Sequence, residues 1–439
     1  MEAPVINVGI MTHKAVSFVF NEEYVHTETG TFTIGEQRAL WVNGKIVYNG
    51  KLYQELFFEP TSPQSSFDLK AVTIGVDFHW QRQEDQRFKG ALNLVATDRG
   101  IVTINQVDVE EYLTSVISSE MSANASKELL KAHAVISRSW LLAQVEKNFN
   151  LNGSVTPYKS CYRDNETLIR WYDREDHELF DVCADDHCQR YQGITRASNP
   201  VVQKVVHETR GEILTDGETI CDTRFSKCCG GVTEQFEHCW EPIPHSYLTA
   251  LRDSRETTFP DLTQEEEAQK WIRSAPDAFC NTSDKAILRQ VLNNYDQETT
   301  DFYRWKVVYT QEELSALILK RSGIDYGQII DLVPIARGTS GRLWKLKIVG
   351  TKKTLTIGKE LEIRRTLSPS HLYSSAFVVD RTELSEAGIP GRFILTGAGW
   401  GHGVGLCQIG AAVMGEQGYG YDAILLHYYI GANIDKLYD

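Results

Sequence analysis

Residues 107–121 of this 439-residue chain read Val107-Asp-Val-Glu-Glu-Tyr-Leu-Thr-Ser-Val-Ile-Ser-Ser-Glu120-Met121. The spacing predicts a helix with Leu113, Val116 and Ile117 on one apolar face. Glu120 continues that face, seven residues after Leu113. A carboxylate there is either buried with a partner or placed at a cleft, where desolvation would raise its pKa and suit it to general acid catalysis. The alternative is a helix-end glutamate that has already reached the surface.

Strands are expected before this helix, and a second helix after it. Asn43-Gly44 predicts a two-residue hairpin between neighbouring β-rich runs, and residues 98–100 predict a further turn. The second helix is expected from about Ser126 to Lys147, with Asn124 or Ser126 as its N-cap. The β-rich runs on which this rests are Val16–Phe20, Ala39–Val42, Lys45–Tyr48 and Ile101–Asn105.

The remainder of the chain alternates between loops, strands and helices. Residues 150–240 indicate loops and strands, and residues 262–295 indicate charged helix. Helices are expected at 311–321 and 421–429, and strands at 343–349 and 354–357. The predicted fold class is therefore α+β, with strand-rich N- and C-terminal parts around the helical segment that carries Glu120.

Composition excludes several classes of protein. The apolar content of 42% is that of a globular protein, and no apolar run approaches the ~20 residues of a transmembrane helix. A net charge of −14 argues against nucleic acid or anionic lipid as the main partner. The first residues have neither a basic nor a long apolar region, so we expect no signal peptide in this chain. That fits a cytoplasmic protein or a mature exported one.

Four charged residues flank Glu120 in the sequence or on the next predicted helix: Glu110, Glu111, Lys131 and Arg138. Glu110 and Glu111 precede the apolar face and have the pattern of ordinary solvated charges. Lys131 and Arg138 are seven residues apart and so share one face of the second helix. They are candidates to hold an anionic or hydroxyl-rich substrate, or to orient the acid. The alternative is a solvated helix face.

Soft metal ligands cluster at His177, Cys183 and Cys188, with His187 as a neighbour. Thiolates and imidazole suit tetrahedral Zn²⁺, although the spacing is not that of a two-knuckle zinc ribbon. A local Cys183–Cys188 disulfide and two unpaired thiols are the alternatives. The fourth ligand would be His187 or water.

Two glycine-bearing segments complete the candidates. In residues 226–231, Cys228 and Cys229 are adjacent, so we expect distant disulfide pairing with Cys221 or Cys239 rather than a bond to each other. In residues 399–408, alternating glycines let the backbone approach a ligand closely and leave His402 and Gln408 as its polar side chains. The segment fits neither a dinucleotide fingerprint nor a P-loop.

From residue 90 onward the chain resembles the SpoIID/LytB family, the sporulation protein D group of bacterial cell-wall proteins. Its two long motifs are similar to segments 105–143 and 399–431. The first similarity rests on Asn105, Val107, Glu110, Tyr112-Leu113, Val116, Glu120-Met121, Leu130-Lys-Ala132, Ala134-Val135 and Arg138-Ser139, and the second on Gly399–Gly410, His427-Tyr-Tyr429 and Gly431. The β-rich runs before the helix form an N-terminal region at 1–105, and the resemblance implies a catalytic region at 106–439, with the charged stretch 262–295 as an insertion.

The resemblance also implies an activity. Members are lytic transglycosylases that cleave peptidoglycan glycan strands between N-acetylmuramic acid and N-acetylglucosamine and form a 1,6-anhydro sugar. The family glutamate falls on Glu120, and Lys131, Arg138 and His402 fall on positions around the cleft. Members can carry zinc near the motif of Cys183 and Cys188, which favours a structural zinc here. Such a substrate implies a location in the periplasm or cell envelope.

Three departures from the family pattern are Ser122, His133 and Cys407, where Pro, Gln and Ser are usual. Two other functions stay open. Some relatives are described as non-catalytic enhancers of a cell-wall amidase, which would bind glycan without cleaving it. A metal-dependent hydrolase would use the ion at His177, Cys183 and Cys188 for chemistry, although thiolate-rich ligation argues against this.

Overall fold

The computed structural model describes residues 2–74, 82–122, 124–152, 159–172, 177–185, 188–195, 199–291 and 301–439. These residues form the expected α+β fold, with strand-rich terminal parts. They divide into two compact units: unit 1 is Met1–Gly153, Asp176–Leu214 and Ile434–Asp439, and unit 2 is Ser154–Glu175 and Thr215–Asn433. The division therefore does not fall at residue 105. The strand that ends at Asp108 runs directly into the helix carrying Glu120, and both lie in unit 1.

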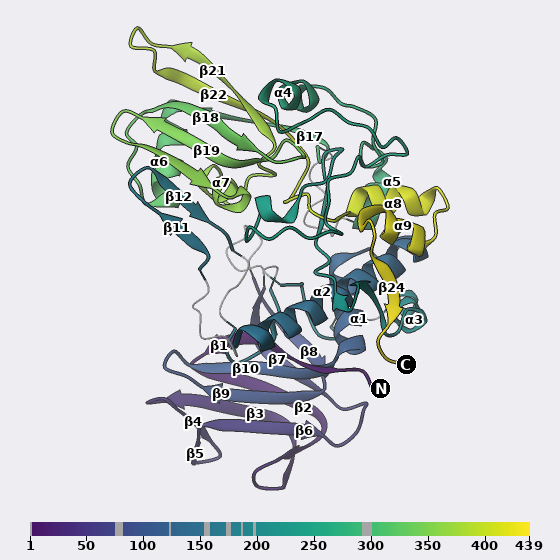
Figure 1. Ribbon diagram of the computed structural model, residues 1–439. Coiled ribbons are helices and arrows are strands. Elements are labelled where there is room, and N and C mark those ends of the chain that lie inside the picture. Colours follow the sequence, from purple (N-terminus) through teal and green to yellow (C-terminus); the bar gives the residue numbers. More distant parts are fainter. Residues whose placement is uncertain are drawn as a thin grey trace. The chain divides into compact units, whose positions relative to one another are not determined.

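Unit 1 is built on one largely antiparallel sheet, whose N-terminal strands are purple in Figure 1. The strand order is β13-β1-β10-β9-β6-β2-β3-β4-β5, with β7 against β2 and β8 against β7. These strands are β1 (Val5–His13), β2 (Ala15–His26), β3 (Thr31–Val42), β4 (Lys45–Tyr48), β5 (Lys51–Tyr53), β6 (Glu55–Pro60), β7 (Ser66–Ile74), β8 (Arg82–Lys89), β9 (Ala91–Ala96), β10 (Ile101–Asp108) and β13 (Val182–Cys183).

The expected hairpin between β3 and β4 is confirmed. Asn43 and Gly44 have φ angles of 51° and 77°, as a primed two-residue turn requires, and Val42 pairs with Lys45. Buried aromatic rings form much of the core of unit 1, and Phe20 stacks on Tyr24 with ring centroids 4.3 Å apart. Strand β10 of this sheet runs directly into α1 (Val109–Glu120), the helix that carries Glu120.

Helices α1 (Val109–Glu120), α2 (Lys127–Asn152) and α3 (Pro200–Glu208) belong to unit 1, as does most of β14 (Glu212–Asp216), which pairs with β24 (Asn433–Lys436). The carboxylate of Asp108 caps α1 by accepting the Glu110 N–H at 2.8 Å. Ser126 Oγ accepts the Leu129 N–H at 3.3 Å at the start of α2. Both helices expected from the sequence are confirmed.

Unit 2 contains two larger sheets, ordered β11-β12-β20-β19-β18 and β17-β22-β21, and a short β16-β23 pair. The strands are β11 (Cys161–Arg163), β12 (Thr167–Arg170), β15 (Thr219–Ile220), β16 (Phe225–Ser226), β17 (Arg304–Thr310), β18 (Ile329–Arg337), β19 (Leu343–Gly350), β20 (Thr354–Gly358), β21 (Phe377–Leu384), β22 (Pro390–Ala398) and β23 (Leu406–Cys407). The helices are α4 (Glu265–Arg273), α5 (Lys285–Val291), α6 (Gln311–Ser322), α7 (Glu360–Thr366), α8 (Gln408–Glu416), α9 (Tyr421–Tyr428) and the 3-10 turn Phe236–His238.

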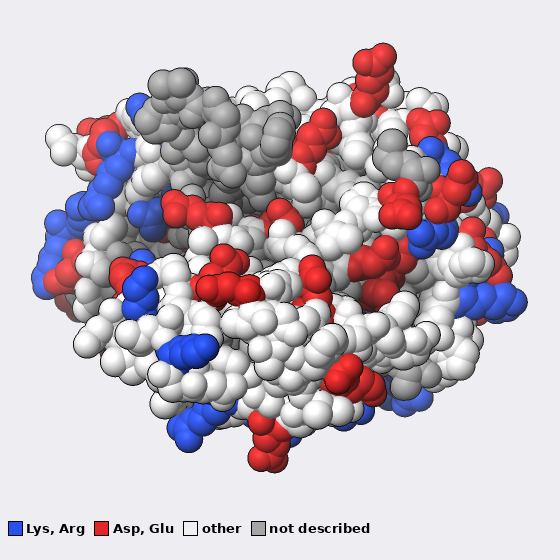
Figure 2. All heavy atoms as spheres, turned by 90° about the horizontal axis from the view of Figure 1, so that it is seen from below, with Lys and Arg blue, Asp and Glu red and all other residues white. Residues whose placement is uncertain are grey.

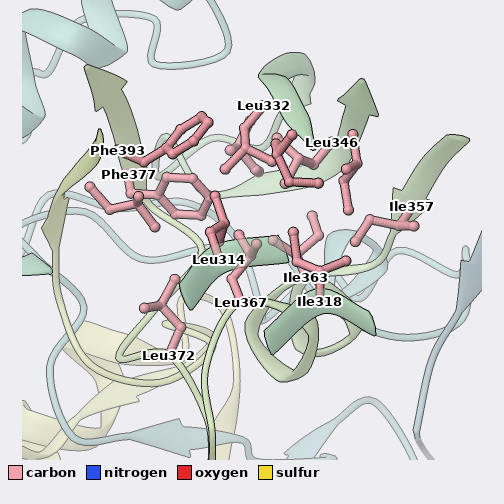
Figure 3. Packing of buried hydrophobic residues seen from close by; sticks show 14 of the residues in the cluster. Leu314, Ile318, Leu332, Leu346, Ile357, Ile363, Leu367, Leu372, Phe377 and Phe393 are labelled. Atoms are coloured by element: carbon pink, nitrogen blue, oxygen red, sulfur yellow. The ribbon is translucent and has the colours of Figure 1, made fainter. Parts of the chain in front are cut away.

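Figure 3 shows the main core of unit 2, where α6 and α7 pack against strands of both larger sheets. Leu314 and Ile318 of α6 and Ile363 of α7 are fully buried there. A capping box between Thr310 and Glu313 begins α6, and Gly323 ends it at φ 70°. The helix expected at 311–321 is therefore confirmed with its caps.

The charged stretch 262–295 contains α4 and α5 with a loop between them, and residues 292–295 lie outside the described part. None of the described helices combines the length and apolar character that a bilayer-spanning segment requires. On the face in Figure 2, acidic side chains lie among scattered Lys and Arg, and its described residues form no continuous basic stripe. This fits the net charge of −14.

Candidate functional site

Glu120 is the last residue of α1 and is half-buried. The apolar face that leads to it is confirmed, because Leu113, Val116 and Ile117 are fully buried. The backbone N–H of Arg190 donates to Glu120 Oε1 at 3.3 Å. The carboxylate is thus held by the protein on one side while part of the side chain stays accessible, as a group that acts on an external substrate requires.

The residues on either side of Arg190, Gln189 and Gln192, hydrogen-bond to side chains of α1 and hold this segment against the helix. Tyr112 donates its hydroxyl proton to Gln189 Oε1 at 3.4 Å, and the Gln192 N–H donates to Ser115 Oγ at 3.1 Å. Burial, followed by the nearby Cys188 and Cys183, raises the pKa of Tyr112, so its phenol remains a donor. These contacts hold the backbone at Arg190 in place, and with it the N–H that donates to Glu120.

The same segment begins at the predicted metal ligands. His177, Cys183 and Cys188 each offer a donor atom, and these atoms lie within 4.8 Å of one another. Cys188 Sγ lies 3.6 Å from His177 Nε2, and the Cys183 N–H donates to Cys188 Sγ at 3.4 Å. Two thiolates and an imidazole in this arrangement fit a tetrahedral zinc site. His187, which with water is one of the two candidates for the fourth ligand, lies outside the described residues.

Strand pairing positions this group of ligands. Cys183 lies in β13, which pairs in parallel with β1 so that Gly9 stands opposite Cys183. A side chain at Gly9 would meet the Phe180 ring at 2.4 Å, and that ring lies 4.7 Å from the His177 ring. The glycine in β1 therefore makes room for the ring that packs on the histidine.

Arg138 and Glu110 form a buried ion pair, which corrects two expectations. Arg138 Nε and Nη2 donate to the Glu110 carboxylate at 3.0 and 2.8 Å, and Arg138 is 0% exposed. Tyr438 also donates its hydroxyl proton to Glu110, at 2.6 Å. Glu110 is not a solvated charge, and Arg138 is not a substrate contact, since none of its atoms reaches solvent. The pair holds α1 against α2.

Lys131 lies two helical turns before Arg138 on α2 and pairs with a different carboxylate. Its ammonium is 2.9 Å from the Glu208 carboxylate at the end of α3. This hydrogen bond raises the pKa of Lys131, which stays charged and partly exposed. The face shared by Lys131 and Arg138 is therefore an interface with carboxylates rather than a solvated helix face.

His402 and Gln408 belong to unit 2, and His402 holds the backbone of its own loop. His402 Nδ1 accepts the Val404 N–H at 3.0 Å, which makes Nε2 the protonated ring nitrogen. Its ring packs edge-on against Trp240 at 4.8 Å. Gln408 begins α8 and is 2% exposed. The expectation that Gln408 faces a ligand is not met, because its side chain is buried.

Arg342 organises the glycine-rich loop 399–405. Its guanidinium donates to the carbonyls of Gly401 and Cys229, at 3.1 and 2.9 Å. A Cβ on Gly403 would lie 2.4 Å from Arg342 Cζ. The glycines thus let the loop pack closely around the buried guanidinium of Arg342. The close backbone approach that the alternating glycines predict is therefore, at least at Gly401 and Gly403, an approach to a side chain of the protein itself.

The titration of His402 yields a testable prediction. Burial lowers the pKa of His402 well below its ordinary value of 6.5, and Arg224, Arg364 and Arg342 act in the same direction. Below pH 6.5 the unfolded chain binds a proton at His402 that the folded chain does not, so the free energy of unfolding falls as pH falls. His402→Gln should flatten this slope by up to about 1.4 kcal/mol per pH unit. Urea unfolding between about pH 5 and 7 measures it, and an unchanged slope would contradict the assignment.

The cysteine pairing expected in segment 226–231 is wrong. No disulfide joins Cys228 or Cys229 to Cys221 or Cys239. Cys229 Sγ instead lies 3.6 Å from Cys280 Sγ, and the Cys229 N–H donates to Cys407 Sγ at 3.2 Å. These partners are 51 and 178 residues away in sequence, a separation that spacing alone does not reveal.

Sequence reasoning missed Arg190, Tyr112 and Gln189 as parts of the environment of Glu120. The contact of Arg190 is made by its backbone, which any residue type can supply, so the side chain carries no signal. Tyr112 did carry a sequence signal, because it lies at a core position of α1 eight residues before Glu120. A buried tyrosine hydroxyl usually has a hydrogen-bond partner, which here is Gln189.

Comparison with known proteins gives two family matches. Residues 97–215 match a family model described as Stage II sporulation protein, and residues 234–405 match one described as a domain of unknown function, DUF8618. The first match contains α1, α2 and the ligands His177, Cys183 and Cys188. The second contains α4 to α7 and the glycine-rich loop 399–405, so the charged stretch 262–295 lies inside a recognised region.

Three relatives cover most of the chain at low identity. An uncharacterized protein of Brachyspira hyodysenteriae is 24% identical over 96% of this chain and 87% of its own length. Stage II sporulation protein D of Bacillus amyloliquefaciens is 24% identical over 76% of each chain. The amidase enhancer of Bacillus subtilis is 23% identical over 73% of this chain and 40% of its own length.

Proposed function

We propose that this chain, which carries a region of the Stage II sporulation protein family at residues 97–215, is a lytic transglycosylase that cleaves peptidoglycan glycan strands. The family match bears out the resemblance found in the sequence, and the relatives support a function related to the cell wall. They also support a location outside the cytoplasm. The observation that carries the finer proposal is the half-buried carboxylate of Glu120, held at the end of α1 by the Arg190 amide.

Glu120 acts first as an acid and then as a base. Its proton passes to the glycosidic oxygen as the bond from that oxygen to C1 of the muramyl residue breaks. The muramyl C6 oxygen then bonds to C1, and its proton passes to the Glu120 carboxylate. A 1,6-anhydro sugar forms, no water is consumed, and Glu120 regains its proton. A second carboxylate is not required, unlike in hydrolysing glycosidases.

We propose different roles for the two carboxylate oxygens of Glu120. Oε1 accepts the Arg190 N–H, so Oε2 is the oxygen that carries the transferable proton. The backbone amide keeps the side chain in one orientation through both proton transfers, which preserves alignment with the substrate. The charged, partly exposed Lys131 is proposed as a donor to glycan hydroxyl groups.

Zinc is proposed at His177, Cys183 and Cys188, where the donor set fits it. The chemistry of this set is structural: thiolate-rich sites hold a fold together. Cys188 lies two residues before Arg190, so an ordered metal site would fix the backbone that holds Glu120. The catalytic steps run through Glu120 alone.

A second candidate function is a glycan-binding enhancer of a cell-wall amidase. The similarity to the amidase enhancer favours it, although the chain matches only 40% of that protein's length. An enhancer would bind glycan strands without cleaving them and would raise the rate of an amidase added to the same reaction.

Peptide-free glycan strands incubated with the purified chain and analysed by mass spectrometry test these proposals. The transglycosylase predicts fragments with 1,6-anhydro ends, one water lighter than hydrolysis products. Uncleaved strands together with stimulation of an added amidase would favour the enhancer. Immediate loss of cleavage on adding a chelator would instead indicate a metal-dependent hydrolase, since a structural ion leaves more slowly than a reaction turns over.

A further inference from the structure

Four buried side chains of unit 2, the unit that does not contain Glu120, converge on one point. Cys229, Asp253, Cys280 and Cys407 each offer one donor atom, and these atoms all lie within 4.8 Å of one another. Each residue is at most 2% exposed. Cys407 lies in β23 directly before α8, and Cys280 lies in the loop between α4 and α5. The cluster thus gathers four separate segments of the chain.

The spacing of the donor atoms is that of a tetrahedral metal site. Zinc–sulfur bonds of about 2.3 Å place two thiolates about 3.8 Å apart on a regular tetrahedron, and a carboxylate oxygen slightly closer. Cys229 Sγ lies 3.6 Å from Cys280 Sγ and 3.6 Å from Asp253 Oδ2. No large movement would be needed to place one ion at equal distances from these atoms.

Hydrogen bonds from two backbone amides of the cluster and from the side chain of Tyr428 orient the ligand atoms. The Cys229 N–H donates to Cys407 Sγ at 3.2 Å, and the Cys280 N–H donates to Asp253 Oδ2 at 3.0 Å. The hydroxyl of Tyr428 donates to Asp253 Oδ1 at 2.6 Å. Outer donors of this kind hold ligands and accept part of their negative charge, and they are typical of metal sites.

The four donor groups lie in the buried interior of unit 2. Ionised thiolate or carboxylate groups in such surroundings need a cation beside them, which a bound metal ion would supply. The guanidinium of Arg342 is nearby and donates to the carbonyl of Cys229 at 2.9 Å.

From this geometry we propose that Cys229, Asp253, Cys280 and Cys407 bind a structural zinc ion, separate from the site at His177, Cys183 and Cys188. The soft thiolates and the tetrahedral spacing select Zn²⁺ over Ca²⁺ or Mg²⁺. The adjacent Cys228 is a buried neighbour and not one of the four ligands.

The ion links the glycine-rich loop to the rest of unit 2. Cys228 pairs with Trp400 of the loop through a β-bridge, and Cys407 follows the loop by two residues. Asp253 and Cys280 tie these segments to the region around α4 and α5. Zinc binding therefore stabilises the conformation of residues 399–407, and this holds whether or not Glu120 is catalytic.

A disulfide between Cys229 and Cys280 is the competing use of the same atoms. It would occupy two of the three thiols and leave Cys407 and Asp253 as adjacent buried acids. Peptide mapping under non-reducing conditions distinguishes the two, because the zinc site predicts that Cys229 and Cys280 are both recovered as thiols. Recovery of a Cys229–Cys280 cross-linked peptide would overturn the proposal.

Metal analysis of the full chain gives the direct test. In a background of Cys183→Ser and Cys188→Ser, which removes the other set of thiol ligands, the purified protein should retain about one zinc per chain. Adding Cys280→Ser or Asp253→Asn should reduce the zinc content to a small fraction. Adding Cys221→Ser, a buried cysteine of the same unit outside the cluster, should leave it unchanged.

A second measurement covers variants that fail to fold. Cobalt exchanged into the Cys183→Ser, Cys188→Ser protein should give thiolate-to-cobalt charge-transfer bands and the visible spectrum of a tetrahedral ion. Zinc content that is the same with and without Cys280→Ser, or a cobalt spectrum without thiolate bands, would overturn the proposal. Because neither measurement depends on glycan cleavage, its failure is distinct from failure of the proposed enzyme activity.

Discussion

Glu120→Gln is expected to reduce the rate of glycan cleavage by roughly 10²–10⁴-fold, the usual contribution of a positioned acid or base. Glutamine has the same shape, and its Oε1 can still accept the Arg190 N–H that holds Glu120. Its amide has no proton to give to a leaving oxygen near neutral pH. The loss should therefore fall on turnover rather than on folding, and initial rates on peptide-free strands measure it.

Glu111→Gln is the matched control on the same helix. Glu111 is partly exposed and pairs with Lys89 at 2.9 Å, so its replacement should leave cleavage unchanged and stability within about 0.5 kcal/mol. The circular dichroism spectrum of both variants should match that of the wild type. Equal rates for Glu120→Gln and Glu111→Gln would remove Glu120 from the chemistry.

Arg138→Met is expected to destabilise unit 1 by about 3–5 kcal/mol, because it leaves the buried Glu110 carboxylate without its cation. The pair joins α1 to α2, and the Arg138 guanidinium also donates to the Glu212 carbonyl at 2.9 Å. Urea unfolding followed by circular dichroism measures the loss. Glycan cleavage per folded molecule should change less than in Glu120→Gln, since Arg138 contacts no solvent.

Lys131→Met provides the comparison for that experiment. It removes a partly exposed pair with Glu208 on the same helix, which should cost about 0–1 kcal/mol. In the double variant Glu110→Gln, Arg138→Met, the two losses should be less than additive because no charge remains buried and unpaired. A loss for Arg138→Met no larger than for Lys131→Met would contradict the role assigned to the buried pair.

Local signals were read correctly from the sequence. The spacing of Leu113, Val116 and Ile117 predicted a buried face, and Asn43-Gly44 predicted its hairpin, because each depends on residues a few positions apart. The α6 helix was found for the same reason, although its capping box was not used. Periodicity and turn chemistry depend only on residues within one element, so a single sequence is enough to recognise them.

Long-range pairing could not be read in this way. Glu110 and Glu111 have the same local pattern, but only Glu110 is buried, where Arg138 and Tyr438 hydrogen-bond to its carboxylate. These partners lie 28 and 328 residues away in the sequence, so the local pattern does not reveal them. His402 and Gln408 were expected to face a ligand, since a glycine-rich loop exposes its few polar side chains. The structure fills that loop with Arg342, which arrives from another segment.

The metal ligands show the same contrast. His177, Cys183 and Cys188 lie within twelve residues, so their spacing alone suggested a site, and their donor atoms do converge. Cys229, Asp253, Cys280 and Cys407 span most of unit 2, and the sequence indicated a disulfide there instead. Only the fold brings the four together.

Digestion of peptide-free glycan strands by the wild-type chain in water enriched in a heavy oxygen isotope tests the central claim most directly. If Glu120 transfers the proton of the muramyl C6 hydroxyl, the new ends are 1,6-anhydro sugars that carry no heavy oxygen. Cleaved ends that carry the label would show that water is the nucleophile and would contradict the mechanism. Strands left uncleaved by a folded chain would contradict the enzyme activity itself.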